Sequence, residues 1–300
     1  AYFALSPLRL NTAVLDFAIQ SGSPLRAASR QIAQAGVPIA DWQFTLLGRI
    51  LGKAAGIKAG SYEISQGITP LQLLEKITKG DVTQTEILLL EGWTFRQMRA
   101  TLDAHPDIRH DTAGLTDLQV MEKLGLEGSP EGRFFPDTYL FARNSSDIDI
   151  LRRAYRQMDQ VFSAGWAARE KGLPYSSPYE ALILASIVEK ETGKTGDRAQ
   201  IASVFLNRLK RGMLLQTDPT VIYGLGEKFD GNLRKRDLLA DGPYNTYTRP
   251  GLPPTPIAMP GTASIQAVMH PAKTEMLYFV ARGDGSSQFS RTLEEHNRAV

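Results

Sequence analysis

The stretch that most constrains the fold spans residues 179–192 and reads YEALILASIVEKET. Apolar residues crowd positions 182–188, with Ser186 as the one polar residue, so a helix here has no broad polar face and is predicted to lie in the interior. Pro178 suits the start of this helix, and Thr192-Gly193 suits its end, with the glycine in the left-handed conformation. Glu191 is therefore predicted to emerge where a core helix ends.

A carboxyl group at that position experiences two effects that oppose its ionisation. It lies at the negative end of the helix dipole, and its neighbours are apolar. Raising the pKa of a glutamate from about 4.3 by roughly two units costs about 2.7 kcal/mol and gives an acid that is still protonated near neutral pH. The alternative is that Glu191 is a solvated helix-end residue paired with Lys190 or Lys194.

Composition excludes several classes of protein. A chain of 300 residues with 42% hydrophobic content can bury a good core in about two domains. Its 34 Lys and Arg against 32 Asp and Glu leave a net charge of +2, which gives no case for a nucleic-acid partner. Cysteine is absent, and His105, His110, His270 and His296 lack metal-ligand spacing, so no metal site is predicted. The longest apolar run, residues 181–188, is far short of the roughly 20 residues of a membrane span.

The first eighty residues have a regular pattern of elements. A strand, two helices and a second strand are predicted at residues 11–20, 25–35, 41–55 and 60–64. In topology and spacing this order resembles a LysM glycan-binding module, and the alternative is a generic small α/β unit. A further helix is predicted at residues 69–79, closed by Gly80, and a long helix at residues 147–171 is expected to pack on the core.

The second half of the chain carries five motifs in a fixed order. They read SIVEKET, VFLNRLKRGMLLQTDPTVIY, YNTY, GLPP and HPAK, and they begin at residues 186, 204, 244, 251 and 270. Together these motifs closely resemble the endolytic murein transglycosylases, the YceG-like family. The match is dense from about residue 173 to residue 297, and a looser correspondence extends to the first residues. The resemblance implies an enzyme that cleaves the glycan strands of peptidoglycan without water and without a cofactor.

The expected architecture is therefore α+β. Residues 1–80 form a small LysM-like α/β module, and residues 81–300 form a mainly helical, lysozyme-like catalytic domain with β insertions. Within that domain, residues 81–172 link the parts and help to form the cleft, and residues 173–300 form the core. The segment EGRFFPDTY at residues 131–139 is either a wall of the sugar cleft or a hydrophobic packing corner.

The resemblance implies that the catalytic acid is Glu191, the second glutamate of the E-K-E triplet. Glu189 is its competitor, but two residues along a helix turn the side chain by about 200°, so only one of them can face a given cleft. Glu191 also fits the general lytic transglycosylase pattern of a hydrophobic helix followed by Glu and Ser/Thr. Glu189 is expected to be a surface residue or to support the acid from behind.

Several residues are expected to contact the sugar. Gln216 ends an element that resembles the G-L-M-Q segment of lytic transglycosylases, and its amide can both donate and accept hydrogen bonds. Asp218 is expected first to cap the helix that Pro219 begins and second to contact substrate. Asn207 and Arg208 are expected to hold the cleft together. The remaining expected contacts are aromatic or amide side chains: Tyr223, Tyr244, Asn245 and Tyr247.

The family resemblance also implies a location and partners. The chain begins with Ala rather than Met, and we expect a single membrane-spanning helix to precede it. That helix would tether the catalytic domain to the outer, periplasmic side of the cytoplasmic membrane. Peptidoglycan glycan strands are the expected substrate, and peptidoglycan synthases, the penicillin-binding proteins, are the expected partners.

Three other functions compete with this interpretation. A hydrolytic muramidase would cut the same bond with water. A non-catalytic peptidoglycan-binding protein would use the LysM-like start and leave strands uncut. A pyridoxal-phosphate lyase would need a phosphate cradle, and the sequence has no glycine-rich phosphate loop.

Overall fold

The computed structural model describes residues 2–20, 22–283 and 285–300 and has an α+β fold. The chain divides into two compact units, each with its own hydrophobic core. The first unit comprises Ala1–Ile87, His105–Asp111 and Tyr139–Asp147, and the second comprises Leu88–Ala104, Thr112–Thr138 and Ile148–Val300.

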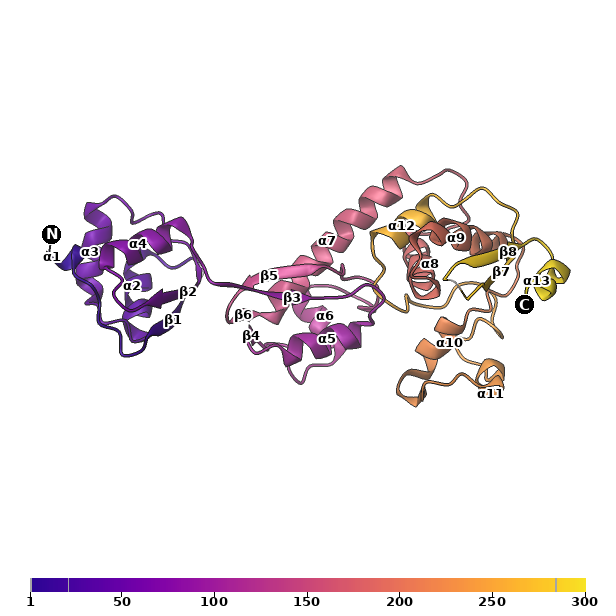
Figure 1. Cartoon of the computed structure of the whole chain (residues 1–300), viewed down its shortest axis with the longest axis horizontal. Helices are drawn as coiled ribbons and strands as arrows, with labels where there is room; N and C mark the ends of the chain where they lie inside the picture. The colour runs from indigo at the N-terminus through magenta and orange to yellow at the C-terminus, as the bar shows by residue number, and fades with distance from the viewer. Residues whose placement is uncertain (1, 21, 284) are drawn as a thin grey trace. The chain divides into compact units, whose positions relative to one another are not determined.

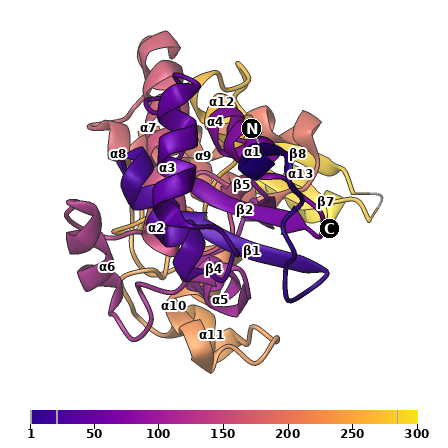
Figure 2. The ribbon, with the colours of Figure 1, turned by 90° about the vertical axis from the view of Figure 1, so that its left-hand side faces the viewer.

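The first unit contains the predicted order of strand, helix, helix and strand, shown in Figures 1 and 2. The elements of this part of the chain are α1 (Tyr2–Leu5), β1 (Val14–Ile19), α2 (Leu25–Gln34), α3 (Asp41–Ile50), β2 (Gly60–Ser65) and α4 (Pro70–Lys79). β1 and β2 pair antiparallel, with Val14 opposite Ser65 and Ile19 opposite Gly60. Phe17 and Ile19 alternate with exposed residues along β1, so one face of the strand pair packs on the core that α2 covers.

Two helix ends in this unit follow from local sequence. Thr69 and Gln72 form a reciprocal capping box at the start of α4, and Gly80 ends that helix in the left-handed conformation, as predicted. The prediction that the helix from Asp41 continues to residue 55 is wrong, because α3 ends at Ile50. Gly52 takes a φ of 66°, and this left-handed residue turns the chain away from the helix axis.

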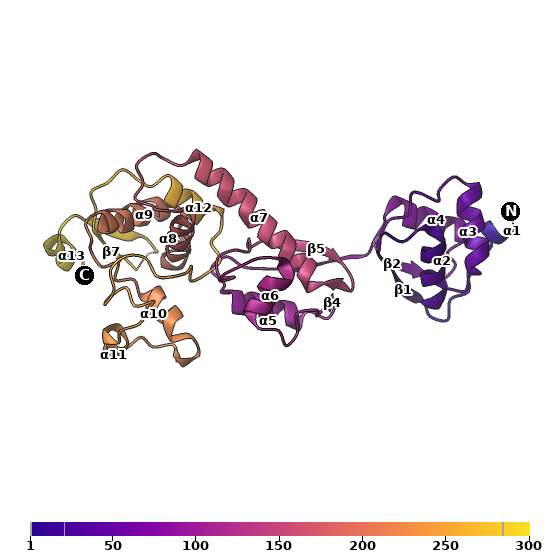
Figure 3. The same cartoon turned by 180° about the vertical axis from the view of Figure 1, so that it is seen from behind.

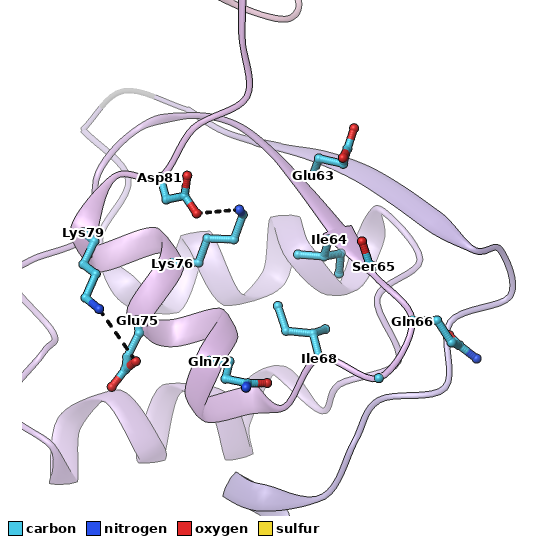
Figure 4. Close-up of a pocket in the computed structure, with 11 residues that line it drawn as sticks. Glu63, Ile64, Ser65, Gln66, Ile68, Gln72, Glu75, Lys76, Lys79 and Asp81 are labelled. Carbon is cyan, nitrogen blue, oxygen red and sulfur yellow. Dashed lines mark hydrogen bonds and ion pairs between the residues drawn. The ribbon is translucent and has the colours of Figure 1, made fainter.

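A polar groove of about 550 Å³ lies beside α4, as Figure 4 shows. Its charged side chains pair with one another: Lys76 lies 2.7 Å from Asp81, and Lys79 lies 4.0 Å from Glu75. Both pairs are partly exposed, so they contribute little to stability.

The middle of the chain supplies short strands and a packing corner. β3 (Gln84–Leu88) pairs with β5 (Thr138–Ala142), and β4 (Ile108–Arg109) runs parallel to β6 (Ser145–Ser146). Phe134 is fully buried and stacks on Phe95 with ring centroids 5.0 Å apart. Phe135 and Tyr139 are buried as well, so the aromatic residues of the segment 131–139 form a packing corner and do not line an open cleft.

The second unit is mainly helical. Its elements are α5 (Phe95–Ala104), α6 (Asp117–Leu124), most of α7 (Asp147–Ala168), α8 (Pro178–Glu191), α9 (Thr195–Lys210), α10 (Asp218–Leu225), η1 (Gly226–Lys228), α11 (Lys235–Leu239), α12 (Thr262–Met269), β7 (Tyr278–Ala281), β8 (Ser287–Ser290) and α13 (Leu293–Ala299). α8, α9 and α12 pack together at its centre, as Figure 3 shows, and β7 and β8 form an antiparallel pair. No helix in the described ranges combines the length and apolarity needed to cross a bilayer.

α8 is the predicted core helix, and every residue from Ala181 to Val188 is buried. Its predicted end is wrong in one detail. Thr192 is extended, with φ −150° and ψ 136°, and Gly193 is not in the left-handed region. The Thr192 hydroxyl instead accepts a hydrogen bond of 3.0 Å from the Lys194 N–H and supports the turn into α9.

Candidate active site

The carboxyl group of Glu191 is positioned by α8. The helix begins at Pro178, where the side chain of Ser177 accepts from the N–H of Glu180 at 3.4 Å. Further along, buried Ser186 accepts from the N–H of Ile257 at 3.0 Å and fixes a neighbouring loop against the helix. Because residues 181–188 of α8 are all buried, Glu191 occupies a fixed place at the end of the core.

Glu191 is not a solvated surface residue. Burial raises the pKa of Glu191 from 4.5 to about 7, the direction and size that the sequence predicts. The hydroxyl of Thr217 donates to Oε1 of Glu191 and partly offsets this rise in pKa. Lys190 turns away and donates to the carbonyl oxygen of Gly92 at 3.2 Å, so the alternative of an ion pair between Lys190 and Glu191 is wrong.

Glu191 opens on a cavity of about 430 Å³, which we call the acid cavity. Three of the expected sugar contacts line it together with Glu191: Gln216, Asp218 and Tyr247. Tyr278 and His296, from β7 and α13, also line this cavity. Residues far apart in the sequence therefore surround one carboxyl group with amide, carboxylate and phenol groups.

Gln216 has an unusual backbone conformation. Its φ is 50°, in the left-handed region that side chains other than glycine rarely adopt, and its N–H donates to Thr246 O at 3.0 Å. A buried pair of threonines holds the neighbouring chain, because the Thr246 hydroxyl accepts from the N–H of Thr217 at 3.1 Å and lies 2.9 Å from that of Thr220. The loop that carries Tyr247 therefore fixes the loop that carries Gln216.

Asp218 does not cap the following helix as expected. It is the first residue of α10, whose N-cap is Thr217, and its carboxylate accepts a hydrogen bond from the Tyr247 hydroxyl instead. The negative charge of Asp218 also raises the pKa of Glu191. Two carboxyl groups therefore influence each other on the acid cavity.

Arg208 lines the acid cavity and holds the surrounding backbone by hydrogen bonds, in agreement with its expected role. It is buried and donates to three backbone carbonyls: Leu277 at 2.7 Å, Leu215 at 2.8 Å and Leu214 at 3.2 Å. The side chain of the preceding residue, Asn207, donates to two more carbonyls at 2.9 and 3.0 Å. These bonds tie α9 to the segment that precedes β7 and to the loop before Gln216.

Glu189 supports the helix from behind and is not a surface residue. Its side chain is only 5% exposed and lies 3.2 Å from the Arg198 guanidinium. The other carboxylate oxygen accepts from the N–H of Gly261 at 2.9 Å. Glu189 and Glu191 therefore leave the same helix in different directions, as the helix geometry requires.

The remaining predicted residues do not line the acid cavity. Asn245 is buried, and its amide donates to the carbonyls of Asp237, Leu238 and Ala240, while its oxygen accepts from the N–H of Tyr247. These bonds give Asn245 a structural role in the loop. Tyr223 and Tyr244 line a second cavity of about 760 Å³, which we call the side cavity.

Sequence reasoning missed Glu131, a buried acid in the wall of the side cavity. Its side chain accepts from the N–H of Phe95 at 2.9 Å and from the hydroxyl of Tyr223 at 3.0 Å. Burial raises the pKa of Glu131 to about 7, against the effect of these two bonds. The sequence signal for Glu131 was its position at the start of the aromatic segment at residues 131–139.

Two other residues of the site also carried no sequence signal. Thr217 is the hydrogen-bond partner of Glu191, and nothing in its spacing indicates this contact. His296 stacks on Tyr278 with centroids 5.4 Å apart, and its buried Nδ1 has no hydrogen-bond partner. The acid cavity thus combines one raised-pKa acid with several groups that can bind a polyhydroxylated ligand.

Known proteins with similar sequences include two endolytic murein transglycosylases. An endolytic murein transglycosylase of Bacillus subtilis (strain 168) is 33% identical over 300 residues, covering 94% of this chain and 82% of that protein. An endolytic murein transglycosylase of Streptococcus pneumoniae (strain D39) is 30% identical over 280 residues, or 81% of this chain, which spans about half (50%) of that relative's length.

A solved structure extends the similarity to the fold. The crystal structure of a YceG-like protein from Listeria monocytogenes superposes with a TM-score of 0.59 at 29% identity, covering 95% of this chain and 98% of that one. The YceG-like family itself matches residues 17–300. Because this match spans nearly the whole sequence, the chain belongs to the YceG-like family.

Proposed function

We propose that this chain is an endolytic peptidoglycan lytic transglycosylase whose catalytic acid is Glu191. It cleaves the β-1,4 bond between N-acetylmuramic acid and N-acetylglucosamine and leaves a 1,6-anhydro end. The observation that carries this proposal is the Glu191 carboxyl group, with a pKa of about 7, at the end of a core helix and open to the acid cavity. The names of its relatives support peptidoglycan as the substrate.

The proposed reaction uses one carboxyl group twice. Glu191 first donates its proton to the glycosidic oxygen, and the bond from that oxygen to the anomeric carbon breaks. The carboxylate then accepts the proton of the 6-hydroxyl of the same muramic acid, whose oxygen attacks the anomeric carbon. Glu191 is thereby protonated again, and no water is consumed. The hydroxyl of Thr217 stabilises the carboxylate between the two steps.

The other residues of the site bind and orient the strand. Gln216 and Tyr247 offer donors and acceptors to sugar hydroxyl and N-acetyl groups on the acid cavity. Tyr223 and Tyr244 contact the substrate from the side cavity. Asn245 acts through the loop whose backbone it holds.

A hydrolytic muramidase is the second candidate, and Asp218 favours it. Glycosidases that use water need a second carboxylate near the acid, to attack the sugar or to activate water. Asp218 lies on the acid cavity, close enough to raise the pKa of Glu191. Its carboxylate already accepts from Tyr247, which leaves it less free to act as a base and favours the lyase reaction.

We further propose the finer organisation and location of the enzyme. Residues 1–80 are a LysM-like glycan-binding module, and residues 81–300 form the catalytic domain with a lysozyme-like core. The order of β1, α2, α3 and β2 supports the first assignment, and the buried α8 that ends in an acid supports the second. A membrane-spanning helix before this sequence tethers the domain to the outer face of the cytoplasmic membrane. There it limits the length of nascent strands near the peptidoglycan synthases.

The test is digestion of purified sacculi, with the released fragments analysed by mass spectrometry. The unmodified protein should release anhydro fragments, which are lighter than hydrolytic products by one water. Glu191→Gln should reduce the rate by roughly 10²- to 10⁴-fold while leaving the fold intact, because the amide has the same shape and cannot donate the proton.

Glu189→Gln is unsuitable as the control, because it would break the buried ion pair with Arg198. Glu122→Gln on the exposed side of α6 changes the same chemical group and should retain full activity. Products that contain the added water would favour the muramidase. An unchanged rate in the Glu191 variant would remove the catalytic assignment.

A further inference from the structure

The side cavity adjoins the acid cavity through two pairs of consecutive residues. At the end of α8, Lys190 lines the side cavity and Glu191 lines the acid cavity. At the start of α10, Pro219 lines the side cavity and Asp218 lines the acid cavity. A ligand that fills the acid cavity therefore has the side cavity next to it, across the ends of the same two helices.

Apolar side chains form one part of the side-cavity wall, and polar and charged side chains form the rest. Pro219, Ile222, Phe229 and Ile257 contribute to the apolar part, together with the rings of Tyr223 and Tyr244. These two rings contact each other edge to face, with centroids 4.9 Å apart.

The hydroxyl groups of both tyrosines are already engaged. That of Tyr223 donates to Glu131 at 3.0 Å, and that of Tyr244 lies 2.9 Å from the Thr255 hydroxyl. The rings therefore offer carbon surface to the cavity, whereas a sugar ring needs several polar partners. This apolar part of the wall suits small apolar groups better than another sugar.

Two cations lie at the rim of this apolar wall. Lys190 is exposed, and Arg96 is 62% exposed in an ion pair with Glu227, which is itself 85% exposed. Such an exposed pair is weak and can exchange for a ligand carboxylate. The two acids of the cavity are otherwise engaged, because Asp117 lies 2.8 Å from Arg99 and Glu131 accepts two hydrogen bonds. An apolar wall with a cationic rim fits a ligand that has methyl groups and carboxylates.

We propose that the side cavity binds the peptide stem of peptidoglycan, and this inference rests on the proposed function. The stem branches from the muramic acid whose bond is cut, so it lies beside the sugar that occupies the acid cavity. Its alanine methyl groups pack on Ile222 and Tyr223, and its carboxylates pair with Lys190 and Arg96. The cavity volume of about 760 Å³ is within the usual range for pockets that hold small ligands.

The test compares two substrates that differ only in the stem. Glycan strands with intact stems and strands stripped of stems by an amidase are supplied to the unmodified protein. The KM for stripped strands should be about tenfold higher at similar kcat, because the lost contacts stabilise ground state and transition state alike. In the double variant Arg96→Gln, Lys190→Gln this difference between substrates should shrink to about twofold or less.

A matched control and a binding measurement make the outcome decisive. Lys194→Gln, at an exposed position outside both cavities, should keep the tenfold difference. Equal KM values for the two substrates in the unmodified protein would overturn the inference. Binding of both strands to the Glu191→Gln protein is measured in parallel by calorimetry. Tighter binding of stem-bearing strands without any cleavage by the unmodified protein would sink the proposed function and support the stem site.

Discussion

Glu191 must be protonated to act as an acid, so its pKa of about 7 sets the pH range of the proposed reaction. The value of kcat/KM should fall about tenfold per pH unit above this pKa. The Thr217 hydroxyl lowers the pKa by donating to the carboxylate, so Thr217→Val should move the descending limb of the profile to higher pH. A pH–rate profile of both proteins checks this, with Thr101→Val on α5 as a control that should not move the limb. A limb that shifts to lower pH would contradict the assignment.

Gln216 combines a strained backbone with a place on the acid cavity. Glycine adopts its φ of 50° without steric cost, whereas alanine does not. Gln216→Gly should therefore be about 1 kcal/mol more stable than Gln216→Ala in denaturant titrations. Both variants lose the amide and should lose at least about tenfold in activity, because the proposed hydrogen bond to the sugar is removed. Equal stability of the two variants would mean that the backbone is not strained here.

At the scale of elements, Glu131 joins the first turn of α5 to α10 through Phe95 and Tyr223. Burial raises the pKa of Glu131 from 4.5 in the unfolded chain to about 7 in the folded protein. Its favourable contribution is therefore complete below pH 4.5 and is lost as the pH rises to about 7, because the unfolded chain releases the proton first. The loss amounts to at most about 3 kcal/mol.

Chemical denaturation at pH 4.5 and pH 8 tests this link between the helices. The free energy of unfolding should fall over this range, and Glu131→Gln should reduce the fall because the amide does not ionise. Asp241→Asn is the control. An ion-paired hydrogen bond from Arg249 holds the pKa of exposed Asp241 well below its usual range, so Asp241 stays ionised throughout. A fall that is as steep in Glu131→Gln as in the unmodified protein would refute the proposed role of burial.

The elements that the sequence predicted well are those with local signals. The buried α8 follows from a dense apolar segment, and α4 follows from Thr69 and Gly80 at its ends. Helix ends were predicted less well, and two further errors occurred where distant residues decide the local contact. Asp218 leaves its expected cap because Tyr247, 29 positions away, donates to it. Glu131 was missed because Tyr223, 92 positions away, is its partner.

At the scale of the whole molecule, the family motifs identified candidate residues but could not predict which cavity or loop each of them occupies. They singled out seven residues for one sugar site. In the structure four of these surround the acid cavity, Tyr223 and Tyr244 line the side cavity, and Asn245 holds a loop. This sorting depends on which way each side chain leaves its helix or loop, and tertiary packing decides that direction.

The burial of residues 181–188 of α8 also determines which parts of the second unit can adapt when a strand enters. Residues 181–188 cannot shift without disrupting the packing of the core. Glu191 is therefore attached to the part of the second unit that is expected to unfold last. α10, which contributes to both cavities, is different, because only its Thr220 and Val221 are buried. Adaptation of the site to a bound polymer is therefore expected at α10 and not at the helix that carries Glu191.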